Sequence, residues 1–180
     1  TIIIIISYYS FQIYQTQHKE WVSNKYNNSI IEYNNGNKME TVSVMREIIE
    51  EQDSTYSPLA LYFLIDNNLI QNQNEVNELF NIIIDKTSLE KEIKNLIIYK
   101  KALYNADFIN ENELLEITKP LINSNSVWKS HALYLMGEYF YSRNENQKSK
   151  EFFNELILLD NANQNLKIES QKRLNRDLSG

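Results

Sequence analysis

The chain has 180 residues and a mass of 21.4 kDa, which suits one folding unit with a core of its own. Its net charge of -6 disfavours nucleic acid as a partner, because phosphate binding needs a surplus of Lys and Arg. With 3 Gly and 2 Pro it is poor in tight-turn residues, which disfavours β-sandwiches and barrels and favours helices, and with no Cys it has no disulfide, thiolate nucleophile or sulfur-ligated zinc.

The first 14 residues are uncharged and mostly apolar, with five consecutive isoleucines, Ile2 to Ile6, followed by the aromatic residues Tyr8, Tyr9, Phe11 and Tyr14. This run is shorter than the ~20 residues of a membrane-spanning helix. The sequence starts at Thr rather than Met, so we expect further residues upstream. We predict that residues 1–14 are the C-terminal part of a transmembrane helix, with the aromatic rings at the membrane interface. The alternative is a buried strand or core helix.

A helix-start pattern recurs along the rest of the chain, in which an Asn can cap a helix and an acid or amide three residues later can reach back. The pairs are Asn37 with Glu40, Asn72 with Glu75, Asn110 with Glu113, and Asn144 with Gln147. Successive Asn residues are 35, 38 and 34 positions apart. This is close to the ~34-residue period of tetratricopeptide repeats, in which each repeat is a pair of antiparallel helices.

Apolar residues recur at fixed distances from these four Asn residues, as one buried helical face requires. Eight and twelve positions after them stand Met45, Phe80, Thr118 and Phe152, and Ile49, Ile84, Ile122 and Leu156. Eleven and seven positions before them stand Tyr26, Leu61, Tyr99 and Leu133, and Ile30, Ile65, Leu103 and Gly137. The pattern therefore predicts a partner helix ahead of each Asn, and we expect Phe80 and Phe152 to be core residues.

These patterns together predict an all-α protein. We expect a tetratricopeptide-like right-handed superhelix of about four antiparallel helix pairs, from about residue 11 to residue 160, in a domain spanning residues 15–180. A weaker amphipathic segment, from Asn165 to Leu178, follows a short polar break. We predict that it is the C-terminal capping helix that a stack of repeats requires.

No arrangement of residues typical of an active site is visible in the sequence. The two histidines, His18 and His131, lie far apart in the predicted repeats, and we expect each at a surface or interface. No glycine-rich phosphate loop, nucleophile elbow or two-His metal motif is present. We therefore predict a protein that is not an enzyme and that has no cofactor, no metal ion and no small-molecule substrate.

The predicted contact surface lies on the first helix of each pair, next to its buried face. Tyrosine is favoured at protein contacts because it combines a large rigid apolar body with a polar tip. The predicted groove for segments of a client protein comprises Tyr62, Asp66, Lys100, Tyr104, Tyr134, Glu138 and Tyr141. The alternative is that some of these rings fill gaps between neighbouring helices.

The stretch SVWKSHALYLMGEYFYSRNENQKSKEFFNELILLD, from Ser126 to Asp160, resembles the last repeat of the YfgM-like family, ancillary subunits of the SecYEG translocon in bacterial inner membranes. Members of that family resemble this chain over nearly its whole length, with one N-terminal membrane helix and a degenerate tetratricopeptide domain. The chain departs from the usual repeat at Lys148 and Ser149, where small residues are expected, and at Asn161 and Ala162, where a Pro is expected.

The resemblance implies a single-pass protein of the bacterial inner membrane whose helical domain lies in the periplasm. It also implies a chaperone-like role at the translocon, with translocon subunits, periplasmic chaperones and emerging polypeptides as partners. The alternative function is an envelope-assembly scaffold that holds other cell-envelope proteins in the same groove. The resemblance supplies no catalytic residues.

Overall fold

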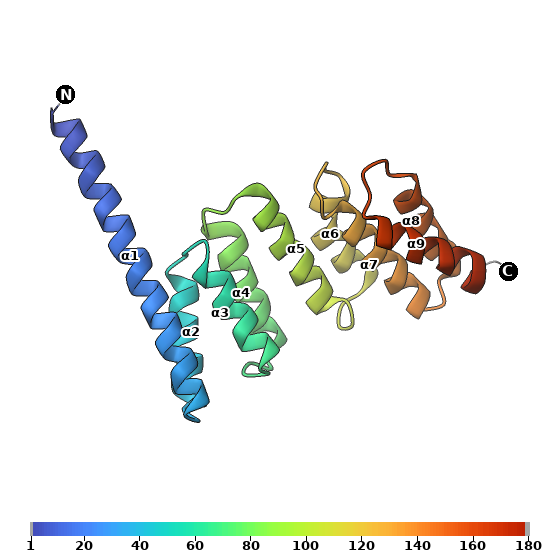
Figure 1. The fold of residues 1–180 in the computed structure, drawn as a ribbon. Helices are drawn as coiled ribbons and strands as arrows, with labels where there is room; N and C mark the ends of the chain where they lie inside the picture. Colours follow the sequence, from blue (N-terminus) through green and yellow to red (C-terminus); the bar gives the residue numbers. More distant parts are fainter. Residues whose placement is uncertain (1, 179–180) are drawn as a thin grey trace. The chain divides into compact units, whose positions relative to one another are not determined.

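The computed structural model describes residues 2–178, and over this range it is all-helical, without a strand (Figure 1). The predicted all-α class is therefore confirmed. The helices are α1 (Ile2–Asn34), α2 (Lys38–Glu50), α3 (Tyr56–Asp66), α4 (Gln73–Lys86), α5 (Lys91–Asn105), α6 (Glu111–Ile122), α7 (Lys129–Ser142), α8 (Asn146–Leu158) and α9 (Gln164–Lys172), followed by the π-helix η1 (Arg173–Asp177).

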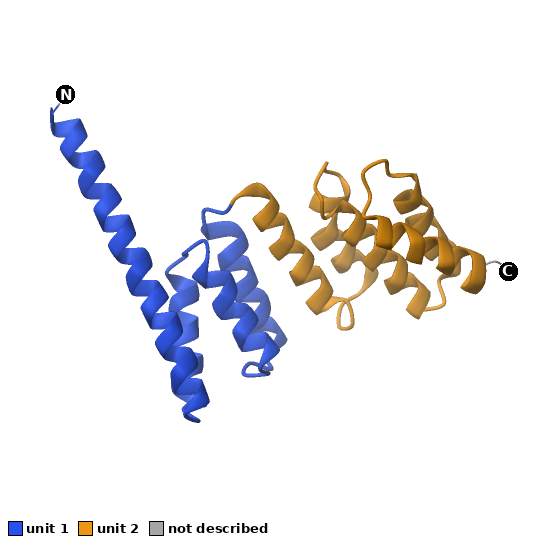
Figure 2. Cartoon of the chain, viewed as in Figure 1, with its two compact units in different colours: residues 1–89 blue, residues 90–180 orange. Residues whose placement is uncertain are grey.

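The helices pack into two compact units, residues 1–89 with α1 to α4 and residues 90–180 with α5 to η1 (Figure 2). Within the first unit α1 packs on α2 and α3 on α4, and the two pairs are joined chiefly by α2 against α3, with smaller contacts of α1 with α3 and of α2 with α4. Within the second unit α5 packs on α6 and α7 on α8, with α6 against α7 and α9 against α8, and with smaller contacts of α5 and α9 with α7. The sequence had predicted one unit from residue 15 onward, and that boundary lies inside the continuous helix α1.

Three of the four predicted helix starts coincide with helix N-caps, at Asn37, Asn72 and Asn110. The side chains of Asn72 and Asn110 each accept hydrogen bonds from the backbone N–H groups two and three residues later. Glu113 completes a capping box by accepting from the backbone N–H of Asn110 at 3.0 Å. These bonds satisfy N–H groups that the first turn of a helix leaves unpaired.

The fourth predicted start is wrong by one residue. The N-cap of α8 is Glu145, whereas Asn144 closes the turn between α7 and α8 with a φ of +60°. Asn is one of the few residues other than Gly that adopt this left-handed conformation readily. The local pattern of an Asn followed by an amide was therefore the signature of a turn at this site rather than of a cap.

With Glu145 as the fourth reference point, four positions are buried in every helix pair. Eight residues before the N-caps lie Ser29, Leu64, Ala102 and Gly137, and four residues after them lie Thr41, Val76, Leu114 and Ser149. Eight and eleven residues after the N-caps lie Met45, Phe80, Thr118 and Phe153, and Ile48, Ile83, Leu121 and Leu156. The same internal register therefore builds the core of all four pairs.

This register corrects the predicted core of the last pair. Phe153 is fully buried, whereas the predicted core residue Phe152 is only partly buried and stacks on Phe140 with ring centroids 5.5 Å apart. The predicted position seven residues before each Asn also fails in an earlier pair, where Leu103 is exposed. Phe80 is buried as predicted.

The N-terminal part of α1 extends beyond α2 as a continuous helix (Figure 1). All residues from Ile2 to Gln17 are exposed, and the first buried residue of the helix is Val22. The alternative prediction of a buried strand or core helix for this segment is therefore wrong for residues 2–14. Within residues 2–178 no helix combines the length and apolar character that would let it cross a membrane.

Candidate protein-binding surface

The first two predicted surface residues, Tyr62 and Asp66, lie one turn apart on α3 in the first unit. Tyr62 is half-buried and Asp66 is exposed. Burial, and secondarily the carboxylate of Asp66, raises the pKa of Tyr62 to about 12. The phenol is therefore neutral at physiological pH and packs much of its ring into the unit, as the gap-filling alternative expected, while Asp66 presents a charge to solvent.

The next two predicted residues, Lys100 and Tyr104, lie one turn apart near the C-terminal end of α5. Lys100 is exposed and Tyr104 is half-buried. The Tyr104 ring lies 6.1 Å from the ring of Phe108, which is 65% exposed. This end of α5 therefore carries two neighbouring aromatic rings that are at least partly exposed, and Phe108 is a residue that the sequence analysis had not indicated.

The last three predicted residues, Tyr134, Glu138 and Tyr141, lie on one face of α7, and the chain's own C-terminal segment covers them. The guanidinium of Arg173 binds the carboxylate of Glu138 through two bonds, Nε to Oε1 at 2.7 Å and Nη2 to Oε2 at 2.8 Å. The same guanidinium lies 4.6 Å from the ring centroid of Tyr141. A bidentate bond of this kind is directional and roughly twice as strong as a neutral hydrogen bond.

The charges around Arg173 support one another. Arg173 also binds Asp177 at 2.9 Å, and its bonds to Glu138 and Asp177 raise its pKa. Bonds from Arg176 and Arg173 hold the pKa of Asp177 well below its usual range. Burial, and then the nearby charge of Glu138, raises the pKa of Tyr134, so Tyr134 is a neutral phenol beside a charged network.

The structure therefore brings three of the seven predicted residues together, at Arg173, and places the α3 pair in the other compact unit. Sequence reasoning identified the segment from Asn165 to Leu178 as a capping helix but missed Arg173 as its contact residue. The spacing of Arg173 and Asp177, four residues apart, indicates an ion pair within the segment but gives no signal of the contact with Glu138.

A second aromatic cluster, also missed, lies in the second unit. Trp128 stacks on Tyr99 with centroids 5.5 Å apart, and the His131 ring lies 4.9 Å from Trp128 and 5.5 Å from Tyr99. His131 Nδ1 is buried. Burial lowers the pKa of His131, so the imidazole is neutral at pH 7 and acts as a packing residue.

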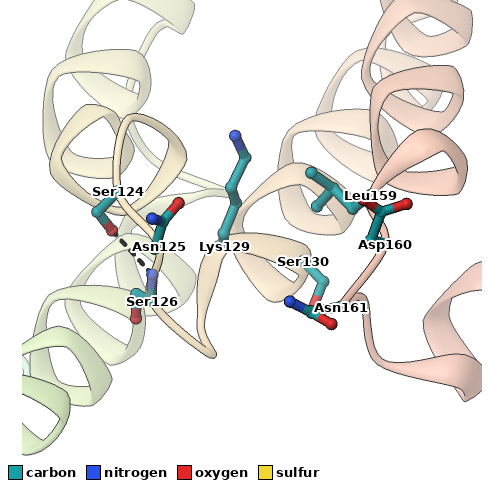
Figure 3. A pocket seen from close by; sticks show the side chains of 8 residues that line it. All are labelled: Ser124, Asn125, Ser126, Lys129, Ser130, Leu159, Asp160 and Asn161. Carbon is teal, nitrogen blue, oxygen red and sulfur yellow. Dashed lines mark hydrogen bonds between the residues drawn. The ribbon is translucent and has the colours of Figure 1, made fainter.

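A polar cavity of about 340 Å³ opens between the α6–α7 and α8–α9 loops (Figure 3). Hydroxyl and amide groups dominate its lining, with Ser124 accepting from the backbone N–H of Ser126 at 3.3 Å. Lys129 projects between the two loops in Figure 3, and its ammonium lies 3.6 Å from Glu155. Since Lys129 and the lining residue Asp160 carry opposite charges, the cavity does not select a ligand of one sign.

Over residues 2–178 no group of three or more His, Cys, Asp or Glu side chains is arranged to hold a metal ion. In comparisons with family models, with curated proteins and with solved structures, nothing matches this chain.

Proposed function

We propose that this chain is a membrane-anchored adaptor that binds other proteins through the first helices of its pairs. The observation that carries the proposal is the exposed, apolar start of α1 in direct continuity with packed helical hairpins. The finer fold that we propose is a tetratricopeptide-like right-handed superhelix. Its support is the set of four buried positions that recurs in every pair.

The membrane part of the proposal rests on how the apolar side chains are distributed around α1. Five consecutive isoleucines, Ile2 to Ile6, point in all directions around the helix, because successive residues are turned by about 100°. Each is more than half exposed. A helix that docks on a protein needs one apolar stripe, whereas a helix that is apolar all round suits hydrocarbon. The tyrosines Tyr8, Tyr9 and Tyr14 follow, as in an interfacial aromatic belt.

The protein-binding part rests on partly exposed aromatic residues beside charges. Tyr104 and Phe108 at the end of α5 form such a surface, and Tyr134 and Tyr141 on α7 form another around Glu138. Aromatic rings with a polar tip contribute much contact area at little entropic cost. Both surfaces lie in the second unit, outside the helix that we assign to the membrane.

The setting that we propose follows the resemblance to the YfgM-like family. It is the periplasmic face of the bacterial inner membrane, beside the Sec translocon, with translocon subunits, periplasmic chaperones and emerging polypeptides as partners. An envelope-assembly scaffold is the competing function, and the two differ in the proteins that contact the α5 surface.

Flotation with phospholipid vesicles tests the anchor. We expect the chain to float with vesicles, and we expect the double variant Ile3→Glu/Ile5→Glu to remain at the bottom of the gradient. Ile31→Glu is the matched control, since Ile31 is an exposed isoleucine of the same helix outside the apolar start. Equal flotation of the Ile3→Glu/Ile5→Glu variant would refute the anchor.

Photo-crosslinking in intact membranes tests the partners. A benzophenone amino acid at Tyr104 should yield adducts with translocon subunits or periplasmic chaperones, identified by mass spectrometry. The same probe at the exposed residue Lys119 on α6 should yield none. Adducts with other envelope proteins alone would support the scaffold instead, and the absence of adducts at Tyr104 would count against both.

A further inference from the structure

The C-terminal segment packs on α7 and α8, and its contact with α7 includes a strong polar interaction. Arg173 makes its bidentate bond to Glu138 and covers Tyr141. Around this contact few residues are buried, with Ser170 the only buried residue of α9 and none in η1. Leu178, directly after η1, adds one buried apolar side chain. Leu166 of α9 also packs, partly buried, against the core cluster of Leu133, Leu156 and Ala162. The ion pair therefore adds a directional contact to α7 beside a modest apolar contact.

The packing face of the segment also carries an uncompensated polar group. Ser170 is fully buried, and its hydroxyl has no hydrogen-bond partner among the described residues. A buried polar group without a partner destabilises the state that buries it. An alanine or another small apolar residue would fit the same place without this cost, so the seat is better suited to a different helix than to the one that occupies it.

The backbone is irregular at the same place. The helix widens into the π-helix η1, which starts at Arg173 and ends with a bond from the backbone N–H of Leu178 to the carbonyl of Arg173 at 3.0 Å. π-turns occur at the C-terminal ends of helices, and this one closes the last helical segment of the chain that the structure describes. The change of helical register thus coincides with the residue that makes the contact to Glu138.

We propose that the α7 face formed by Tyr134, Glu138 and Tyr141 is a recognition site for an amphipathic client helix that carries an arginine and, three residues before it, a small apolar residue. The C-terminal segment of the chain, Gln164–Leu178, occupies the site until such a helix displaces it. The inference rests on the proposed protein-binding function and specifies its partner by chemistry. Binding of the client helix to α7 therefore requires release of the C-terminal segment.

A labelled synthetic peptide tests this exchange. The probe is residues 163–178 with Ser170→Ala, acetylated, amidated and carrying a fluorophore, and its anisotropy is titrated with the full 180-residue chain in mild detergent. The protein variant Arg173→Ala weakens the resident segment and should bind the probe at least about tenfold more tightly than the unsubstituted chain, since a charge-assisted bond contributes on that order. A second change in the protein, Glu138→Gln, should abolish the gain.

Matched peptides separate the arginine contact from general charge. A probe with Arg173→Gln should bind about tenfold more weakly, whereas one with Arg176→Gln should bind nearly unchanged, because the side chain of Arg176 is largely exposed and makes its ion pair within the segment, with Asp177. Equal binding of the two probes, or full binding to the Glu138→Gln protein, would overturn the proposal.

Hydrogen exchange in the unsubstituted chain gives a test that does not depend on a variant folding. A saturating amount of probe should speed amide exchange in residues 164–177 and leave exchange in α5 and α6 unchanged. Unchanged exchange in residues 164–177 with bound probe would overturn the displacement. These measurements are independent of the membrane and of the Tyr104 surface, so their failure together with retained Tyr104 adducts would refute this inference and leave the adaptor function intact.

Discussion

Replacing Gly137 by Ala should destabilise the second unit, because α7 and α8 cross in close contact at this residue. A Cβ built at Gly137 lies 2.5, 2.7 and 2.8 Å from Cε1, Cδ1 and Cζ of Phe153. Carbon atoms in good contact are about 3.5–4.0 Å apart, so the ring would have to retreat by about 1 Å. Phe153 is fully buried, so its ring can retreat only if neighbouring core side chains move as well.

The expected size of the effect follows from two opposing contributions. Overpacking of a core costs about 1–3 kcal/mol, and three contacts below 3.0 Å on one buried ring place this case near the upper end. Alanine in place of glycine inside a helix stabilises by about 1 kcal/mol. The net expectation is a loss of about 2 kcal/mol in the free energy of unfolding.

Urea unfolding followed by tryptophan fluorescence can measure this loss in the second unit alone. In a Trp21→Phe background the remaining tryptophan, Trp128, reports on the unit that contains Gly137. The control is Phe153→Leu, which removes the ring that clashes. In that background Gly137→Ala should become neutral or stabilising by up to about 1 kcal/mol. An equal or higher stability of Gly137→Ala with Phe153 in place would refute the reasoning.

Three further outcomes are expected. Phe153→Ala should lower the free energy of unfolding by about 3–5 kcal/mol. Phe152→Ala should lower it by clearly less, because only Phe153 is fully buried. Equal losses of the two variants in urea titrations would contradict the register. Asn110→Ala should cost about 1 kcal/mol through loss of the capping box, whereas a variant as stable as the parent in thermal unfolding would speak against the cap. Burial lowers the pKa of His131 below its ordinary 6.5, so the unfolded chain binds a proton at His131 more readily than the folded chain does. The free energy of unfolding should therefore fall as pH drops below about 6.5. His131→Asn should reduce this loss of stability between pH 7 and pH 5, and an unchanged loss would exclude His131 as a cause.

The helix pairs could be predicted from the sequence because their signals are local. Asn72 and Asn110 cap helices through bonds to residues two and three positions later, and such bonds depend little on the rest of the fold. The one-residue error in the last pair arose because Asn also favours left-handed turns, as Asn144 does. A choice between these two roles depends on how α8 packs on α7, through Gly137 and Phe153, and that packing is tertiary.

The surface residues were harder to predict because exposure on a helix depends on what packs beside it. Periodicity identified Glu138 and Tyr141 as neighbours of the buried face of α7, and both lie there. It could not identify Arg173 as their contact, since 35 residues separate Arg173 from Glu138 in the chain. Tyr62 shows the same limit, because the depth of a tyrosine ring is set by neighbouring helices.

The unbroken course of α1 has a mechanical consequence. Residues from Tyr14 to Val22 form one continuous helix that connects the exposed isoleucine end of α1 to the part of α1 that packs in the first unit. These two parts of α1 are therefore rigidly connected. Every residue inserted in this stretch would turn the isoleucine end by about 100° against α2 and push it about 1.5 Å outward. Only insertions close to a whole number of helical turns would leave the orientation of the isoleucines relative to α2 unchanged. Because the helix is continuous, a rotation of its exposed end would be transmitted to the end that packs on α2.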